Sequence, residues 1–138
     1  MSEKELQEKY LLYQILQQNL ENLKQQLEMV EKQFIEIKTT EEIFKDFKNR
    51  KGTDDVLLPL GSGCYGKGDV RDLKNVMVNV GANIMVNKTT ESAKLFMRER
   101  EKELERASKE IQEHMVKTAN DINQTAMEIQ KLAAKMKK

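Results

Sequence analysis

Two long stretches of the chain carry the hydrophobic spacing of a coiled coil, and they flank a short centre of a different kind. In the first stretch, apolar residues recur at alternating steps of three and four, with polar residues between them. The series is Tyr13, Leu16, Leu20, Leu23, Leu27, Val30, Phe34, Ile37 and Phe44, and the polar Glu41 occupies the step between Ile37 and Phe44. This spacing predicts a helix over residues 1–50 with a narrow apolar stripe, the seam, that needs a partner helix.

The second stretch, residues 89–138, repeats this spacing with smaller side chains. Thr89 and Thr90 are suitable N-cap residues for its helix. Its seam positions are Phe96, Leu104, Ala107, Ile111, Met115, Thr118, Ile122, Thr125, Ile129, Leu132 and Met136. Because the centre must return the chain, we expect antiparallel pairing of the two seams, with the chain termini together at the far end.

The centre, residues 54–88, alternates in the manner of β-strands and is punctuated by glycine-rich turns. The predicted strands are Val56–Leu60, Tyr65–Val70, Val76–Val80 and Ile84–Lys88. They form two consecutive β-hairpins. The expected fold class is α+β, mainly α: a single domain with a long antiparallel two-helix coiled coil and two β-hairpins at one end.

Two hairpins of this size bury too little apolar surface to be stable alone, and their open edges invite pairing with other chains. We therefore expect the hairpins of several subunits to assemble into a shared sheet or barrel. The residues expected to form this contact are Val56, Leu58, Leu60, Tyr65, Val76, Val78, Val80, Ile84 and Val86.

The start of the first helix holds more apolar residues than a seam can cover. Tyr10, Leu11, Leu12 and Tyr13 are consecutive, so some must face outward near the free end of the helix. Clustered exposed apolar side chains indicate a contact surface. The alternative is local overpacking or a wider helical bundle.

Composition and charge exclude several functions. The 24 basic and 23 acidic residues leave a net charge of +1, which indicates neither a nucleic-acid nor a membrane-surface partner. No apolar run approaches about 18 residues, and no secretory signal is visible, so we expect a cytoplasmic protein. The single cysteine, Cys64, and the single histidine, His114, lie in different predicted elements, which argues against a metal site and against catalysis.

The glycines at Gly61, Gly63 and Gly66 match a dinucleotide-binding pattern, and the segment Gly61–Lys67 matches the start of a phosphate-binding loop. Both motifs require a helix directly after the glycines to hold the phosphates. Here a predicted strand follows, and Gly68 stands where Ser or Thr would bind magnesium. We therefore expect a hairpin turn, no nucleotide site and no cofactor.

The order of the predicted elements and the segments Leu58–Gly63 and Val76–Gly81 resemble the alpha subunit of archaeal prefoldin, over essentially the whole chain. The resemblance implies a hexamer in which this chain joins a second alpha subunit and four beta subunits. It also implies a β-barrel body from which coiled coils project. Proteins of this family bind non-native proteins without ATP and transfer them to a group II chaperonin.

Binding of such clients requires exposed, adaptable apolar groups, which the free ends of the two helices offer. The candidate residues are Leu6, Tyr10, Leu11, Leu12, Ile129, Leu132, Ala133 and Met136. A structural coiled-coil scaffold or a filament-forming prefoldin-like protein remains the alternative interpretation.

The glycine-rich turn gives a first testable prediction. A titration of the full chain with ATP, GTP or NAD should show no saturable binding, because no helix follows the glycines. Saturable binding that is lost in the Gly63→Val variant would contradict this interpretation.

Overall fold

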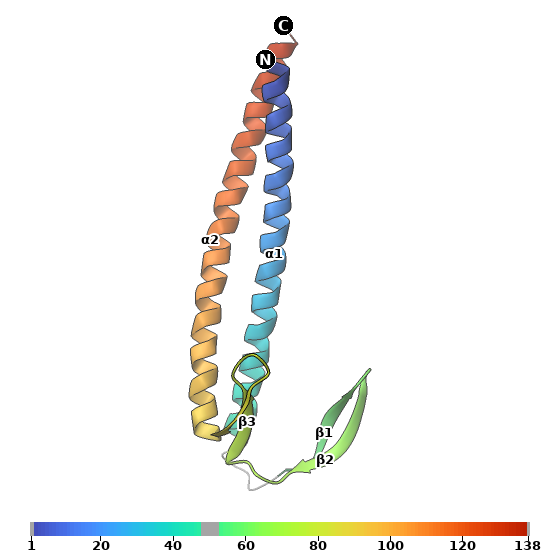
Figure 1. Ribbon diagram of the computed structural model, residues 1–138, viewed down its shortest axis with the longest axis vertical. Helices are drawn as coiled ribbons and strands as arrows, with labels where there is room; N and C mark the ends of the chain where they lie inside the picture. The colour runs from blue at the N-terminus through green and yellow to red at the C-terminus, as the bar shows by residue number, and fades with distance from the viewer. Residues whose placement is uncertain (1, 48–52, 138) are drawn as a thin grey trace. The chain divides into compact units, whose positions relative to one another are not determined.

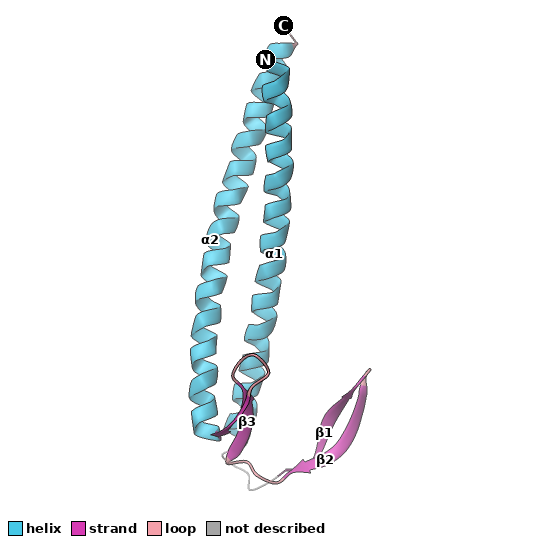
Figure 2. Ribbon diagram, in the orientation of Figure 1, coloured by secondary structure: helices cyan, strands magenta, loops and turns pink. Residues whose placement is uncertain are grey.

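The computed structural model describes residues 2–47 and 53–137. Along the chain, one long helix precedes four strands and a second long helix follows them (Figure 1). Helix α1 is Ser2–Phe47 and helix α2 is Thr90–Met136. The strands are β1 (Thr53–Gly61), β2 (Cys64–Val70), β3 (Asn75–Asn79) and β4 (Met85–Thr89) (Figure 2). The predicted fold class is confirmed. The predicted end of the first helix at residue 50 lies outside the described residues.

The chain divides into two compact units, which are described separately. The terminal unit comprises Met1–Gln33 and Leu104–Lys138, and the hairpin unit comprises Phe34–Glu103. Each helix therefore contributes one part to each unit.

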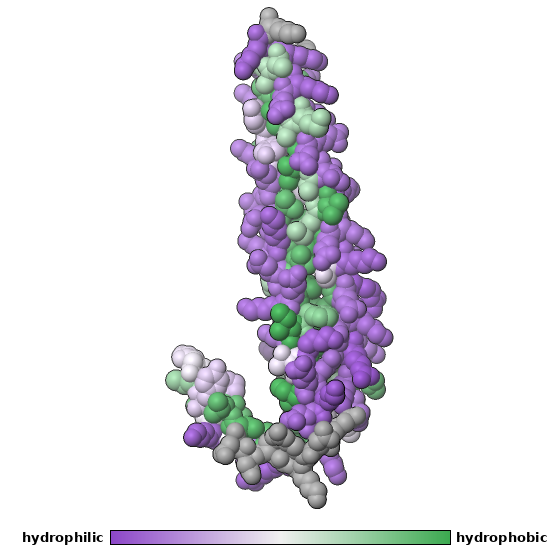
Figure 3. Space-filling view, turned by 180° about the vertical axis from the view of Figure 1, so that it is seen from behind, coloured by the Kyte–Doolittle hydropathy of each residue, from purple (hydrophilic) through white to green (hydrophobic). Residues whose placement is uncertain are grey.

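In the terminal unit, the two helices pack antiparallel through the predicted seam. The seam residues of α1 are partly buried, whereas the polar residues between them are exposed. On α2, Thr125 and Ile129 are buried. Lys9 of α1 pairs with Glu128 of α2 at 2.6 Å, which confirms that the beginning of α1 faces the end of α2. Figure 3 shows the apolar stripe between polar flanks.

In the hairpin unit, a small hydrophobic core joins the helices to β3. Its buried members are Phe44 of α1, Val78 of β3 and Ala93 of α2, and Ala93 is wholly inaccessible to solvent. The residues packed around them are Phe47, Val76, Phe96 and Met97. This core holds one face of the β3–β4 hairpin within its own subunit.

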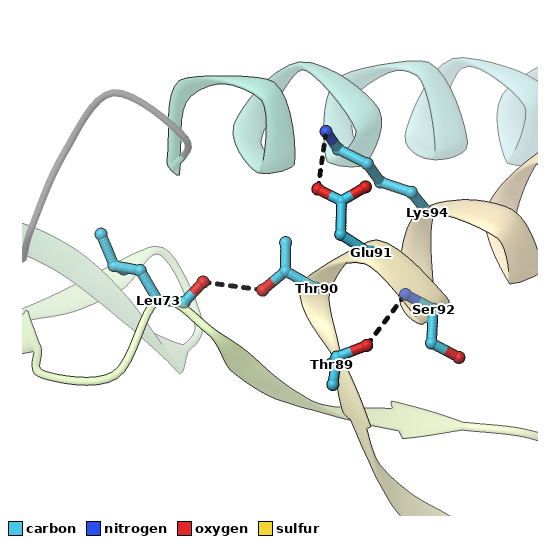
Figure 4. A network of polar contacts seen from close by, with 6 residues as sticks. All are labelled: Leu73, Thr89, Thr90, Glu91, Ser92 and Lys94. Atoms are coloured by element: carbon cyan, nitrogen blue, oxygen red, sulfur yellow. Dashed lines mark hydrogen bonds and ion pairs between the residues drawn. The ribbon is translucent and has the colours of Figure 1, made fainter.

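The junction between β4 and α2 is fixed by hydrogen bonds to the segment that precedes β3 (Figure 4). The buried Thr90 hydroxyl donates to the carbonyl oxygen of Leu73 at 2.7 Å, and the Thr90 backbone N–H donates to the carbonyl oxygen of Lys74 at 2.8 Å. The Thr89 hydroxyl accepts from the backbone N–H of Ser92 at 3.1 Å. This N-cap bond confirms that the helix begins where the threonines predict.

The loop before β3 is closed by the carboxylate of Asp72. Its Oδ1 accepts from the backbone N–H groups of Lys74 and Asn75 at 2.8 and 3.2 Å, respectively. The bond from Lys74, followed by the bond from the Asn75 side chain, lowers the pKa of Asp72. The charged Asp72 carboxylate therefore serves as the hydrogen-bond acceptor for these two backbone N–H groups in the turn.

Both hairpins are antiparallel, and each forms a separate two-stranded sheet. Between β1 and β2, Ser62 and Gly63 have φ values of 52° and 78°. Two consecutive positive φ values are typical of the tight hairpin turns that favour glycine. The glycine-rich motif is thus a hairpin turn followed by strand β2, as predicted.

The Thr90→Val variant should destabilise the full chain by about 1–3 kcal/mol, because the buried Leu73 carbonyl then lacks its hydroxyl donor. Urea unfolding followed by circular dichroism at 222 nm measures this loss. Thr39→Val is the matched control, since the Thr39 hydroxyl donates to the Ile35 carbonyl on an exposed face. The control should change stability by less than about 0.5 kcal/mol. Equal losses in both variants would show that the Thr90 bond is not special.

Candidate assembly and client-binding surfaces

The β1–β2 hairpin carries large apolar side chains that its own subunit leaves in solvent. Leu57, Leu58, Leu60 and Tyr65 are 62%, 47%, 72% and 61% exposed, respectively, and Val56 is partly buried. We call these five residues the hairpin surface. A cluster of this kind is characteristic of an interaction site, unlike single scattered apolar residues.

The sequence of β2 explains why the leucines of β1 gain so little cover from their partner strand. Leu58 lies over Gly68 and Leu60 lies over Gly66, and neither glycine has a side chain to pack against them. Each strand also pairs with only one neighbour, so one edge of each strand is left without a ladder partner among the described residues. Another chain that covers the leucines would therefore also find strand edges to pair with.

In the β3–β4 hairpin, some of the residues that the sequence assigns to assembly are exposed and others are buried. Val80, Ile84 and Val86 are exposed. Val78 is 5% exposed and packs in the core of its own subunit, where the partly buried Val76 lies against it. Val78 is therefore a core residue in this structure and contributes no free assembly surface.

The beginning of α1 presents an exposed apolar cluster. Tyr10, Leu11 and Leu12 are 50%, 58% and 40% exposed, whereas Leu6 is partly buried in the seam. The structure thus separates the consecutive apolar residues into those that serve the seam and those that face solvent.

The end of α2 supplies less exposed surface. Met136 is exposed, Leu132 and Ala133 are partly buried, and Ile129 is buried in the seam. Ile129 is thus not accessible while the helices are packed. We call Tyr10, Leu11, Leu12 and Met136 the tip surface.

Further exposed apolar residues were not selected from the sequence. Leu57 lies on the strand face opposite Val56, Leu58 and Leu60, and Met77 and Met85 likewise lie opposite the selected residues of β3 and β4. Each of the three is more than half exposed. The signal was the unbroken apolar run Val56-Leu57-Leu58, because strands covered on both faces lose their polar alternation. Ile15 adds exposed surface one turn beyond the α1 cluster.

A close ion pair between Lys9 and Glu128 lies beside the tip surface. The hydrogen bond from Lys9 lowers the pKa of Glu128. Both side chains are 37% exposed, so water screens the pair and its contribution to stability is small. The pair therefore adds little to the contact between the two helices at this end.

Within residues 2–47 and 53–137, no group of His, Cys, Asp or Glu side chains is arranged to hold a metal ion. The described helices also include none that is long and apolar enough to cross a membrane.

These features define a class of protein in which two β-hairpins link two long helices, with apolar surface exposed on the hairpins and at the helix ends. Comparison with known proteins supports a specific family. Residues 16–135 match the Prefoldin family model, described as prefoldin subunit. The chain belongs to this family, which is a family of chaperones.

Its relatives include archaeal alpha subunits. The chain is 33% identical over 138 residues to "Prefoldin subunit alpha" of Archaeoglobus fulgidus, with 99% of this chain and 98% of the relative covered. It is 29% identical over 133 residues to "Prefoldin subunit alpha" of Pyrococcus horikoshii, covering 96% and 90% of the two chains. The resemblance to the archaeal alpha subunit is confirmed.

A solved structure has the same fold. The "Cryo-EM structure of filamentous PFD from Methanocaldococcus jannaschii" superposes with a TM-score of 0.71 and 19% sequence identity. The match covers 84% of this chain and 96% of that chain. At this identity the likeness concerns the arrangement of helices and strands.

Proposed function

We propose that this chain is the alpha subunit of an ATP-independent holdase that binds non-native proteins in the cytoplasm and transfers them to a group II chaperonin. The observation that carries the proposal is the tip surface. Tyr10, Leu11 and Leu12 stand in solvent beside a seam that already provides the helix contact. Their exposure has no use in folding the subunit and suits contact with the apolar segments of an unfolded chain.

The hairpin surface supports assembly with related subunits. Its leucines and tyrosine are too exposed to stabilise an isolated two-stranded sheet. Membership of the prefoldin family and the alpha-subunit names of the relatives favour partners of the beta type. We propose a hexamer of two alpha and four beta subunits, in which the hairpins form a shared β-barrel.

Assembly also determines how strongly clients are held. A half-exposed leucine offers roughly 1 kcal/mol on burial, so one tip alone binds weakly. Once one tip has bound a flexible client, contacts by further tips are intramolecular and avoid the cost of a new bimolecular encounter, which raises the avidity. Weak single contacts and strong multiple contacts allow both capture and release without nucleotide hydrolysis.

A filament-forming scaffold is the second candidate function. It is favoured by the filamentous assembly that gives the structural neighbour its title. The two candidates differ in the type of assembly that they predict. A scaffold of this chain alone forms open polymers, whereas a chaperone subunit forms a discrete complex with beta-type chains.

The double variant Tyr10→Ser, Leu11→Ser tests the tip surface. It removes two half-exposed apolar side chains and should lower the apparent affinity of the assembled complex for an unfolded client by about tenfold or more. Light scattering of a heat-denatured test protein, without nucleotide, measures how well the complex suppresses aggregation.

Met29→Ser is the matched control, because Met29 is also an exposed apolar residue of α1 but lies outside the tip surface. Both variants should keep the native mass and helicity of the wild type, and only the tip variant should lose suppression. Full suppression by the tip variant would show that clients bind elsewhere.

A further inference from the structure

A carboxyl group lies in the apolar seam of the hairpin unit. Glu41 follows the seam spacing between Ile37 and Phe44, both of which are buried. The residue itself is partly buried, and its Oε1 is enclosed without a hydrogen-bond partner. A buried charged oxygen with no partner is costly, and proton uptake is the usual way for a protein to reduce that cost.

A second carboxyl group, Glu101 of α2, lies against Glu41. Its side chain is 14% exposed, and its Oε1 lies 2.5 Å from the Nζ of Lys38. Glu101 thus has a cation of its own, while Glu41 contacts a second negative group. Two carboxylates in one site disfavour simultaneous ionisation.

Basic side chains of both helices lie around the two carboxyl groups. From α1 they are Lys38 and Lys45, and from α2 they are Lys94 and Arg98. Lys45, Lys94 and Arg98 line a cavity of about 300 Å³ together with Glu41. Glu91 lies 3.9 Å from Lys94, which reduces the positive charge available to Glu41.

The two carboxyl groups respond to these surroundings in opposite directions. Burial raises the pKa of Glu41, and the hydrogen bond with Glu101 and its negative charge raise it further, against the opposing charges of Lys38 and Arg98. The hydrogen bond from Lys38, and then the bond with Glu41, lowers the pKa of Glu101. Opposite shifts of this kind are expected when two neighbouring carboxyl groups titrate as a coupled pair.

We propose that Glu41 and Glu101 share one proton across the helix pair of the hairpin unit, and that loss of this proton weakens the packing of α1 against α2 there. The protonated Glu41 donates to the Glu101 carboxylate, which Lys38 neutralises. When the proton leaves, the seam holds two negative charges, and the enclosed oxygen of Glu41 is ionised. The proposal does not depend on client binding.

The pH range follows from the directions of the shifts. The raised pKa of Glu41 contributes stability that is present below the ordinary glutamate value of 4.5 and is lost as pH rises through the raised value. The lowered pKa of Glu101 contributes stability that is present above 4.5 and is lost as pH falls through the lowered value. The pair therefore stabilises the helix contact most near pH 4.5 and less as the solution approaches neutrality.

Carboxyl-carbon NMR of the full chain with ¹³C-labelled glutamate tests the shared proton directly. One glutamate signal should titrate at higher pH than the others, disappear in Glu41→Gln and move toward 4.5 in Glu101→Gln. The signal should remain in Glu42→Gln, the matched control, because Glu42 is the exposed neighbour on the same helix. A high-pH signal that persists in Glu41→Gln, or that Glu101→Gln leaves unmoved, would overturn the proposal.

Thermal unfolding between pH 4.5 and 8 tests the effect on packing. The amide that Glu41→Gln introduces keeps a donor for Glu101 and cannot ionise, so the Tm of this variant relative to wild type should rise by about 2–4 °C between pH 4.5 and 8. The relative Tm of Glu42→Gln should stay constant over this range. The proposal fails if the two variants follow the same pH dependence, or if Glu41→Gln is less stable than wild type throughout.

Discussion

Hydrophobic burial within one chain is small, and the rest of the structure depends on that constraint. Among the described residues, the buried hydrophobic side chains are Ile37, Phe44, Leu73, Val78, Ala93 and Ile129, and no large side chain is completely enclosed. A two-helix seam is narrow, and a two-stranded hairpin has no second layer to cover it. Folding of one chain therefore leaves apolar surface exposed to solvent.

The exposed surface is not distributed at random. In the hairpin unit, β1 and β2 place Leu58 and Leu60 over glycines, so these leucines gain little cover from their own subunit. In the terminal unit, Tyr10 and Leu11 lie beside the seam and are exposed to solvent. The first arrangement fits the proposed contact with other subunits through strand edges, and the second fits the proposed contact with clients.

Much of this organisation could be predicted because it follows from local spacing. The heptad repeat determined which α1 residues enter the seam, and the threonines marked the start of α2. The alternation of β3 correctly grouped Val76 and Val78 on one face, but spacing alone does not tell whether a face packs on its own helices or on a partner. The core contact of Val78 with Phe44 and Ala93 is a tertiary feature and was missed for that reason.

Glu41 is a polar residue whose tertiary contacts likewise could not be predicted from sequence spacing. The sequence marked it as an interruption of an apolar series, which is a common feature of coiled coils. Its significance depends on Glu101 and Lys38, which only the pairing of α1 with α2 brings to it. The seam of the hairpin unit thus contains the carboxyl groups of Glu41 and Glu101 among its apolar residues. The same unit contains the strands that carry the hairpin surface.

The central claim is that the hairpin surface is an assembly surface, and native mass spectrometry tests it most directly. The full chain, mixed with a beta-type prefoldin subunit, should form a discrete hexamer of two alpha and four beta chains. The Leu58→Asp, Leu60→Asp variant should keep its helicity and remain outside that complex, because burial of the two carboxylates is costly. A hexamer that forms equally well with the variant, or a wild-type chain that forms no complex with the beta-type subunit, would contradict the claim.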